Sequence, residues 1–158
     1  MLQLILLRHA KAAPATDADD DHSRPLAPEG REAAPRMAAA LAVAGAAPEV
    51  ALISDAQRTR ETWELAAPSF PKAKVSFLKS LYLCPAETLM LEAEKSGAAS
   101  IILVGHNPGM HELASRLAYR NTELDQKLRA RFSPASGAIF ERKDAKSSWR
   151  LHTFVAPK

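Results

Sequence analysis

Residues 2–9 read Leu-Gln-Leu-Ile-Leu-Leu-Arg-His, a short apolar run that is closed by an arginine and a histidine. Two more runs of this kind, Val50–Ile53 and Ile101–Val104, lie further along the chain. Continuous apolar runs of this length are typical of strands that are covered on both faces, as in a parallel sheet. We therefore predict buried strands at Leu2–Leu7, Val50–Ile53 and Ile101–Val104.

Further strands and helices alternate with these runs. Three more segments are predicted as strands: Lys74–Leu78, Gly137–Glu141 and Trp149–Phe154. Apolar residues three and four apart are typical of helices that bury one face. They predict four helices: Glu29–Gly45, Arg58–Ala67, Ala86–Ser96 and Met110–Leu117. Two stretches are predicted as loops: Ala10–Pro28 and Tyr119–Ser136. The alternation favours a single α/β domain that spans residues 1–158.

The first predicted helix contains a conflict. Pro35 lies within it, and a proline in a regular helix interior removes a hydrogen bond and costs about 3 kcal/mol. We therefore expect this helix either to begin later than Glu29 or to be kinked at Pro35.

Composition and charge limit the classes of protein to which the chain can belong. Its 158 residues are 47% hydrophobic and 25% charged, which excludes a disordered or collagen-like chain. The net charge of +3 is well below that of a typical nucleic-acid-binding domain. No apolar run approaches the roughly 20 residues of a membrane span. The apolar start meets Arg8 too soon for a signal peptide, and the one cysteine, Cys84, cannot form an internal disulfide. We expect a cytoplasmic protein with no nucleic-acid or membrane partner.

Basic and polar side chains follow all three buried strands. They are Arg8 and His9 after the first strand, Ser54 and Arg58 after the second, and Gly105, His106 and Asn107 after the third. Ligands of open α/β sheets bind at the carboxyl ends of the strands, so we expect these residues to converge. Two arginines and two histidines at one place describe a site for a compact dianion such as a phosphoryl group, because guanidinium donors match phosphate oxygens.

Each residue type has a place in such a site. Gly105 would allow close backbone approach, and Asn107 would cap a helix whose first residue is Pro108, aiming its free N–H groups at the anion. A neutral imidazole is a competent nucleophile toward phosphorus, and water can then cleave the phosphohistidine that it forms. Structural interpretations stand beside these: Arg58 as a solvated helix charge, Ser54 as a helix N-cap, and residues 105–109 as a turn.

Other phosphate chemistries lack their motifs. The residue six beyond Cys84 is Met90, not the arginine of a cysteine phosphatase, and no phosphate loop, dinucleotide-binding glycine motif or nucleophile elbow occurs. The spacing of His106 and His111 does not place two zinc ligands on one helix face. A metal site built from His9, His22, His106 or His111 remains an alternative, although the sequence pattern assigns no carboxylate to it as a further ligand.

Five segments, in order along nearly the whole chain, resemble the histidine phosphatase superfamily, and within it the short bacterial SixA-type phosphohistidine phosphatases. They are Leu4–Lys11, Arg24-Pro25-Leu26 leading to Gly30-Arg31, Ser54–Thr62, Leu81-Tyr82-Leu83 and Val104–Gly109. The resemblance implies the phosphoglycerate-mutase-like fold, a three-layer α/β/α arrangement with a mostly parallel central sheet. It also implies that His9 is the nucleophile, that Arg8, Arg58 and His106 hold the phosphoryl group, and that no metal or cofactor takes part. Ser54, Gly105 and Asn107 are expected to help bind the substrate.

One departure from the family bears on the substrate. Other branches carry a carboxylic acid soon after the third strand, whereas Ser80–Pro85 has none, and Glu87 is expected in the first turn of the next helix. A phosphorylated imidazole leaves readily once protonated, but an alkoxide needs help from a general acid. We therefore expect a monomeric enzyme that acts on phosphohistidine in a protein, for example a histidine-phosphotransfer domain. The alternatives are a broad small-molecule phosphomonoesterase and a non-catalytic phosphoprotein-binding module.

Two further expectations concern the surroundings of the site. The acidic run Asp17–Asp21 is interpreted as a solvated surface segment, with the alternatives that it repels free anionic metabolites or meets a basic docking face. Tyr82, Trp63 and Trp149 are interpreted as core or rim packing.

Overall fold

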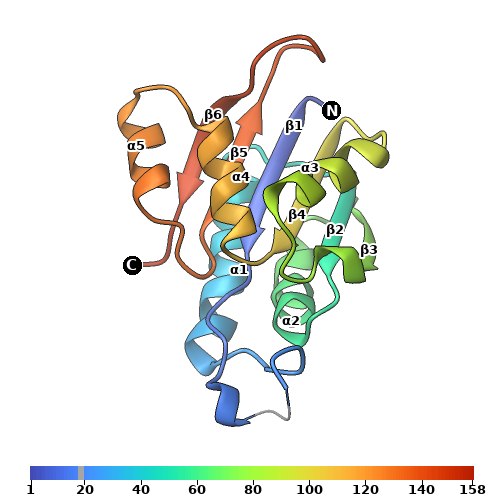
Figure 1. Ribbon diagram of the computed structural model, residues 1–158, viewed down its shortest axis with the longest axis vertical. Helices are drawn as coiled ribbons and strands as arrows, with labels where there is room; N and C mark the ends of the chain where they lie inside the picture. Colours follow the sequence, from blue (N-terminus) through green and yellow to red (C-terminus); the bar gives the residue numbers. More distant parts are fainter. Residues whose placement is uncertain (18–19) are drawn as a thin grey trace.

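A six-stranded sheet forms the centre of the computed structural model, which describes residues 1–17 and 20–158 (Figure 1). The strands are β1 (Gln3–Arg8), β2 (Val50–Ser54), β3 (Lys74–Leu78), β4 (Ser100–Gly105), β5 (Gly137–Glu141) and β6 (Arg150–Val155). Their order across the sheet is β3-β2-β4-β1-β5-β6. β1 to β4 are parallel, whereas β5 is antiparallel to both of its neighbours. All six predicted strands are confirmed, with ends shifted by at most one residue.

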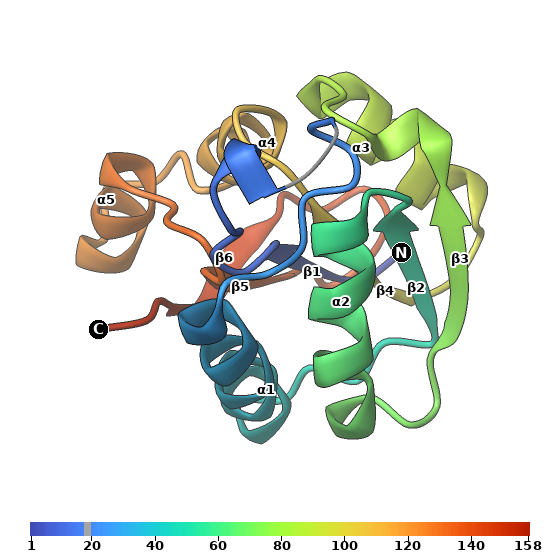
Figure 2. The same ribbon diagram turned by 90° about the horizontal axis from the view of Figure 1, so that it is seen from below.

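Helices cover both faces of this sheet. They are α1 (Pro28–Val43), α2 (Gln57–Ala66), α3 (Ala86–Lys95), α4 (Gly109–Leu117) and α5 (Glu123–Ala130). Figure 2 shows α1 and α2 on one face and α3, α4 and α5 on the other. The expected three-layer α/β/α fold with a mostly parallel sheet is confirmed. No helix in the described part of the chain combines the length and the apolar character needed to cross a bilayer.

The alternation of side chains along β1 explains why its sequence is apolar throughout. Leu4 and Leu6 belong to the core beneath α3 and α4, whereas Ile5 and Leu7 belong to the core beneath α1 and α2. All four are fully buried. Successive side chains of a strand point to opposite faces, so a strand covered on both sides needs an apolar residue at every position.

The conflict at Pro35 is resolved in favour of an early start. α1 begins at Pro28, in the first helical turn where proline is tolerated, and continues past Pro35 to Val43. The expectation that the helix begins later than Glu29 is therefore wrong. The fully buried side chains of Ala34, Ala38 and Leu41 fix this helix against the sheet, and their packing offsets the cost of the internal proline.

The stretch Tyr119–Ser136 is not entirely a loop, because α5 lies within it. Its N-terminus is a capping box in which the Thr122 hydroxyl accepts from the Asp125 N–H and the Asp125 carboxylate accepts from the Thr122 N–H. Leu128 is fully buried on the inner face of the helix. The loop prediction is wrong here because the capping box and this single apolar anchor hold a helix with few apolar residues.

Candidate active site

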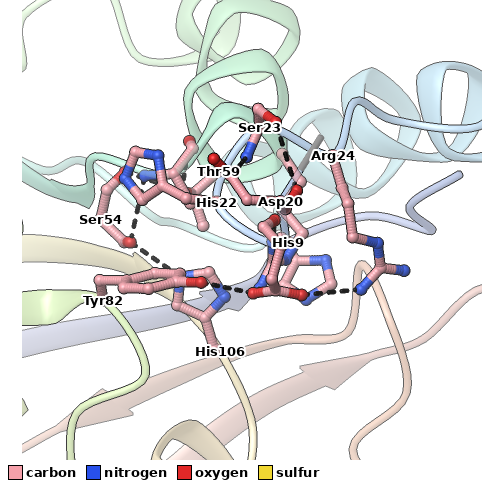
Figure 3. Close-up of polar contacts among 12 residues, drawn as sticks. His9, Asp20, His22, Ser23, Arg24, Ser54, Thr59, Tyr82 and His106 are labelled. Atoms are coloured by element: carbon pink, nitrogen blue, oxygen red, sulfur yellow. Dashed lines mark hydrogen bonds and ion pairs between the residues drawn. The ribbon is translucent and has the colours of Figure 1, made fainter. Parts of the chain in front are cut away.

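The carboxyl ends of β1, β2 and β4 meet at one edge of the sheet. Parallel pairing sets Arg8 opposite Gly105, and Ile53 opposite Val104. The residues that follow these pairs therefore lie together, and the His9 N–H donates to the Gly105 carbonyl oxygen at 3.0 Å. The structure thus brings His9 and His106 to one place, with ring centroids 5.3 Å apart (Figure 3).

His9 is held in one tautomer by the backbone carbonyl group of the next residue. Its Nδ1 lies 2.7 Å from the Ala10 carbonyl oxygen, and because a carbonyl oxygen only accepts, Nδ1 carries the hydrogen. A neutral ring then has its lone pair on Nε2. Burial of the ring, with 8% of the residue exposed, and the nearby charges of Arg8, Arg58 and Arg24 lower the pKa of His9 to about 3. His9 therefore presents an unprotonated nitrogen at neutral pH.

His106 is oriented by a serine. Its Nε2 lies 2.7 Å from the Ser54 hydroxyl, and its Nδ1 is buried without a partner among the described residues. In Figure 3 the ring nitrogen that Ser54 does not bind lies on the side toward His9. Burial and the nearby His9 and Arg58 lower the pKa of His106 to about 3. For Nδ1 to donate to a bound anion, Nε2 must accept, and the Ser54 hydroxyl then supplies the hydrogen.

Ser54 does not have the capping role that was one of its two interpretations. The N-cap of α2 is Ala56, so the N-cap interpretation is wrong. Ser54 is fully buried and its hydroxyl contacts His106. In this arrangement Ser54 orients the His106 ring.

Arg58 lies inside the fold, and its interpretation as a solvated helix charge is wrong. Only 3% of the residue is exposed. Its helix is tied to the segment after β1 by Thr62, whose hydroxyl donates to the Arg58 carbonyl oxygen at 2.7 Å and accepts from the Ala10 N–H at 3.0 Å. The guanidinium donates through Nη1 to the Asp21 carbonyl oxygen at 2.8 Å and through Nη2 to the Asp21 carboxylate at 3.0 Å.

Asp21 is the site residue that sequence reasoning missed. Besides Arg58, its carboxylate accepts from the Tyr82 hydroxyl at 2.5 Å and from Nη1 of Arg24 at 3.1 Å. These hydrogen bonds, that from Tyr82 foremost, hold the pKa of Asp21 well below its usual range. Asp21 is exposed, as the interpretation of residues 17–21 as a solvated run expects, but its carboxylate is also bonded to three side chains of the site. Ala18 and Asp19 lie outside the described residues.

Tyr82 and Arg24 complete the wall around the two imidazoles. The Tyr82 ring lies edge-on to His106, with centroids 5.5 Å apart, which fits the expected rim position. Arg24 is fixed from behind by the Ala13 carbonyl oxygen, which accepts from both Nε and Nη2. In Figure 3 these two side chains lie on either side of His9 and His106.

Arg8 approaches the site from the end of β1. Its Nη1 donates to the Phe132 carbonyl oxygen at 3.1 Å, and its Nε is buried without a partner among the described residues. Burial and the charge of Arg58 lower the pKa of Arg8.

Gly105 and Asn107 are occupied by contacts within the fold. A Cβ at Gly105 would lie 3.3 Å from the Met110 sulfur, so the absence of a side chain here leaves room for core packing. The Asn107 amide donates to the Phe132 carbonyl oxygen and accepts from the His111 N–H. Asn107 thus does bond to the start of α4, but the helix begins at Gly109, so the placement of Pro108 at its first position is wrong.

The remaining polar candidates are engaged elsewhere. His22 pairs with Asp55 at 2.9 Å, and Nε2 of His111 donates to the Leu128 carbonyl oxygen. Within residues 1–17 and 20–158, no three His, Cys, Asp or Glu side chains are grouped as metal ligands. Glu87 stands in the first turn of α3, as expected, and its exposed carboxylate is bonded to Arg116.

This arrangement combines a free imidazole nitrogen with several cationic or neutral hydrogen donors. Guanidinium groups bind phosphate oxygens strongly, and a nitrogen with a depressed pKa stays available for attack on phosphorus. The geometry is therefore suited to phosphoryl transfer.

Known proteins share both the sequence pattern and the fold. Residues 4–81 match the family model of the histidine phosphatase superfamily, branch 1. A protein from Agrobacterium tumefaciens with a provisional assignment as the phosphohistidine phosphatase SixA is 30% identical, with 99% of this chain and 98% of that one covered and a TM-score of 0.85. A Nakamurella multipartitia protein with the same provisional assignment is 26% identical over 99% and 96% of the chains, with a TM-score of 0.84. An uncharacterized chloroplastic protein of Arabidopsis thaliana is 32% identical over 98% of this chain and 78% of its own.

Proposed function

Since the chain belongs to the histidine phosphatase superfamily, is of the SixA type and is a phosphatase, we propose that it hydrolyses phosphohistidine in a protein through a covalent intermediate on His9. In this proposal residues 1–158 act as one histidine phosphatase domain, Arg8, Arg58 and His106 hold the phosphoryl group, and the enzyme acts in the cytoplasm as a monomer without a cofactor.

The observation that carries this proposal is the fixed tautomer of His9. The hydrogen bond from Nδ1 to the Ala10 carbonyl oxygen leaves Nε2 as the nucleophile. The depressed pKa keeps that nitrogen unprotonated at neutral pH, which spares the cost of removing a proton before attack. A histidine that only bound phosphate would serve better protonated, because it would then donate from both nitrogens.

The reaction proceeds in two displacements. In the first, Nε2 of His9 forms a bond to phosphorus while the bond from phosphorus to the substrate imidazole breaks, and that imidazole leaves with the bonding pair. In the second, water attacks phosphorus, the bond to His9 breaks, and inorganic phosphate leaves. Arg8, Arg58 and Nδ1 of His106 stabilise the equatorial oxygens in both steps, and one such preorganised donor is typically worth about 2.7–4 kcal/mol.

The substrate follows from the protons that the site can supply. Asp21 is a carboxylate close to the site, but its hydrogen bonds to Tyr82, Arg24 and Arg58 keep it ionised, so it has no proton to give to an alkoxide. Ser80–Pro85 supplies no acid either. A phosphorylated imidazole that is protonated on its other nitrogen leaves as a neutral ring and needs no such acid. The partner is therefore a protein phosphorylated on histidine, and a histidine-phosphotransfer domain is the example we would test.

The test compares turnover on two kinds of substrate. The protein is given a histidine-phosphorylated phosphotransfer domain and, separately, an alkyl phosphate monoester such as glycerol 3-phosphate, and kcat/KM is measured for each. We expect at least a hundredfold preference for the phosphoprotein, and His9→Ala should abolish both activities. A preference for the monoester would instead support the small-molecule phosphomonoesterase.

A further inference from the structure

The most densely bonded anion near the two imidazoles belongs to the protein itself. One carboxylate oxygen of Asp21 accepts from Nη2 of Arg58 and from the Tyr82 hydroxyl, and the other accepts from Nη1 of Arg24. Three donors from three separate segments thus converge on one carboxylate, in the manner expected for a bound anion. Figure 3 shows Tyr82 and Arg24 reaching inward from either side of His9 and His106.

The Asp21 carboxylate binds Arg58, the same cation that the proposed reaction requires. Both terminal nitrogens of Arg58 are engaged by Asp21, one through its carbonyl oxygen and one through its carboxylate. The Arg58 side chain is 4% exposed and has little freedom to turn elsewhere, whereas the Asp21 side chain is 45% exposed and can move outward. The negative charge of Asp21 also acts on His106 and raises its pKa against the effect of burial.

We propose that Asp21 is a specificity-determining residue that competes with the phosphoryl group for Arg58 and Arg24. The inference rests on the proposed function in placing that group at Arg58, and Arg24 is included because its Nη1 donates to the same carboxylate. A dianion that enters the site must either displace the carboxylate or bind beside it against the repulsion of like charges. Either course weakens its binding, since the apparent affinity falls with the fraction of sites that are free to bind.

The competition falls hardest on small anions. Inorganic phosphate brings no contacts besides those to its own oxygens, so nothing compensates for the displaced carboxylate. A phosphorylated protein brings further contacts at the rim, which can offset that cost. Asp21 therefore disfavours free phosphate esters and hastens the release of inorganic phosphate after hydrolysis.

Asp21→Asn provides the direct test, because the amide oxygen can still accept from Tyr82 while the charge is removed. Inorganic phosphate is titrated into the protein by calorimetry, which does not require turnover. We expect phosphate to bind about tenfold more tightly to Asp21→Asn. Asp20→Asn is the matched control, since the Asp20 carboxylate accepts from the Ser23 N–H in the same loop, and its phosphate affinity should equal that of the wild type.

The opposite result has a clear meaning. If Asp21 merely holds Arg58 and Arg24 in place for the phosphoryl group, then Asp21→Asn will bind phosphate equally or more weakly, and the inference is overturned. Asp21→Ser, which also removes the charge, gives the same measurement if the asparagine variant does not fold.

A kinetic measurement separates this inference from the proposed function. Asp21→Asn should lower KM for p-nitrophenyl phosphate by about tenfold and lower KM for the phosphoprotein much less. If Asp21→Asn binds phosphate more tightly but the protein has no phosphohistidine activity, the competition by Asp21 is supported and the proposed substrate is rejected. Phosphohistidine activity with unchanged phosphate binding would do the reverse.

Discussion

Replacement of Ser54 by alanine tests how His106 is oriented. The Ser54 hydroxyl lies 2.7 Å from Nε2 of His106, and both residues are buried. Without the hydroxyl, the hydrogen of His106 is no longer held on Nδ1, which weakens its hydrogen bond to the phosphoryl group. A hydrogen bond to a charged group is worth about 1.5–3 kcal/mol, so we expect a loss in kcat/KM of roughly tenfold to 150-fold. The upper limit is set by the loss of the His106 donor itself, about 2.7–4 kcal/mol.

The assay is a double-mutant cycle on kcat/KM. Ser54→Ala, His106→Ala and the double variant are compared with the wild type on the same substrate. Because Ser54 acts through His106, its replacement should have little further effect once His106 is alanine. Ser100→Ala is the matched control: Ser100 is also a buried serine with one side-chain partner, Gln3, at the opposite end of β4, and activity should be unchanged.

Additive losses would refute this reasoning. If Ser54→Ala costs as much in the His106→Ala background as in the wild type, then the serine contacts the substrate by itself. The sequence-based expectation that Ser54 binds substrate would then hold, and the structure-based role would not.

Three other variants probe separate features of the fold and the site. The pKa of His9 is lowered to about 3 from 6.5, so the unfolded chain binds more protons in between and stability should decline as pH falls through that window. Urea unfolding against pH should show a flatter profile for His9→Asn, and an unchanged profile would contradict the depressed pKa. Gly109→Ala places a Cβ 2.2 Å from the Cys84 carbonyl oxygen and should lower the free energy of unfolding by about 1–3 kcal/mol. Gly105→Ala should cost less, because its Cβ meets the side chains of Met110 and Leu89 at 3.3 Å or more, and equal losses would count against the close contact at Gly109. Thr122→Ala removes the capping box of α5 and should cost about 1 kcal/mol in chemical denaturation, whereas no change would mean that α5 does not depend on its cap.

The strands and the positions of the two histidines were predictable because they depend on local patterns. An apolar run with a basic end marks a buried parallel strand, and the carboxyl ends of such strands meet at one edge. His9, Arg58 and His106 each follow a run of this kind, so their convergence required no knowledge of distant contacts. The family resemblance added the roles that a pattern cannot assign.

The environment of these residues was not predictable in the same way. Asp21 lies in an acidic run that reads like any solvated segment, and its importance comes from Arg58, 37 positions away. Gly105 and Asn107 were expected to bind the substrate, and that stays a prediction; their contacts with Met110 and Phe132 were not predictable because they are set by packing. Contacts of this kind follow from the folded arrangement rather than from spacing in the sequence.

The covalent step is tested most directly by locating the phosphoryl group on the enzyme. The protein is mixed with a radiolabelled phospho-donor, quenched in alkali, digested, and the labelled peptide is sequenced by mass spectrometry. We predict an acid-labile, alkali-stable label on His9 that is lost in His9→Ala and retained in His22→Ala, a nearby histidine that pairs with Asp55. A label on another residue, or one that survives in His9→Ala, would contradict the assignment of His9 as the nucleophile.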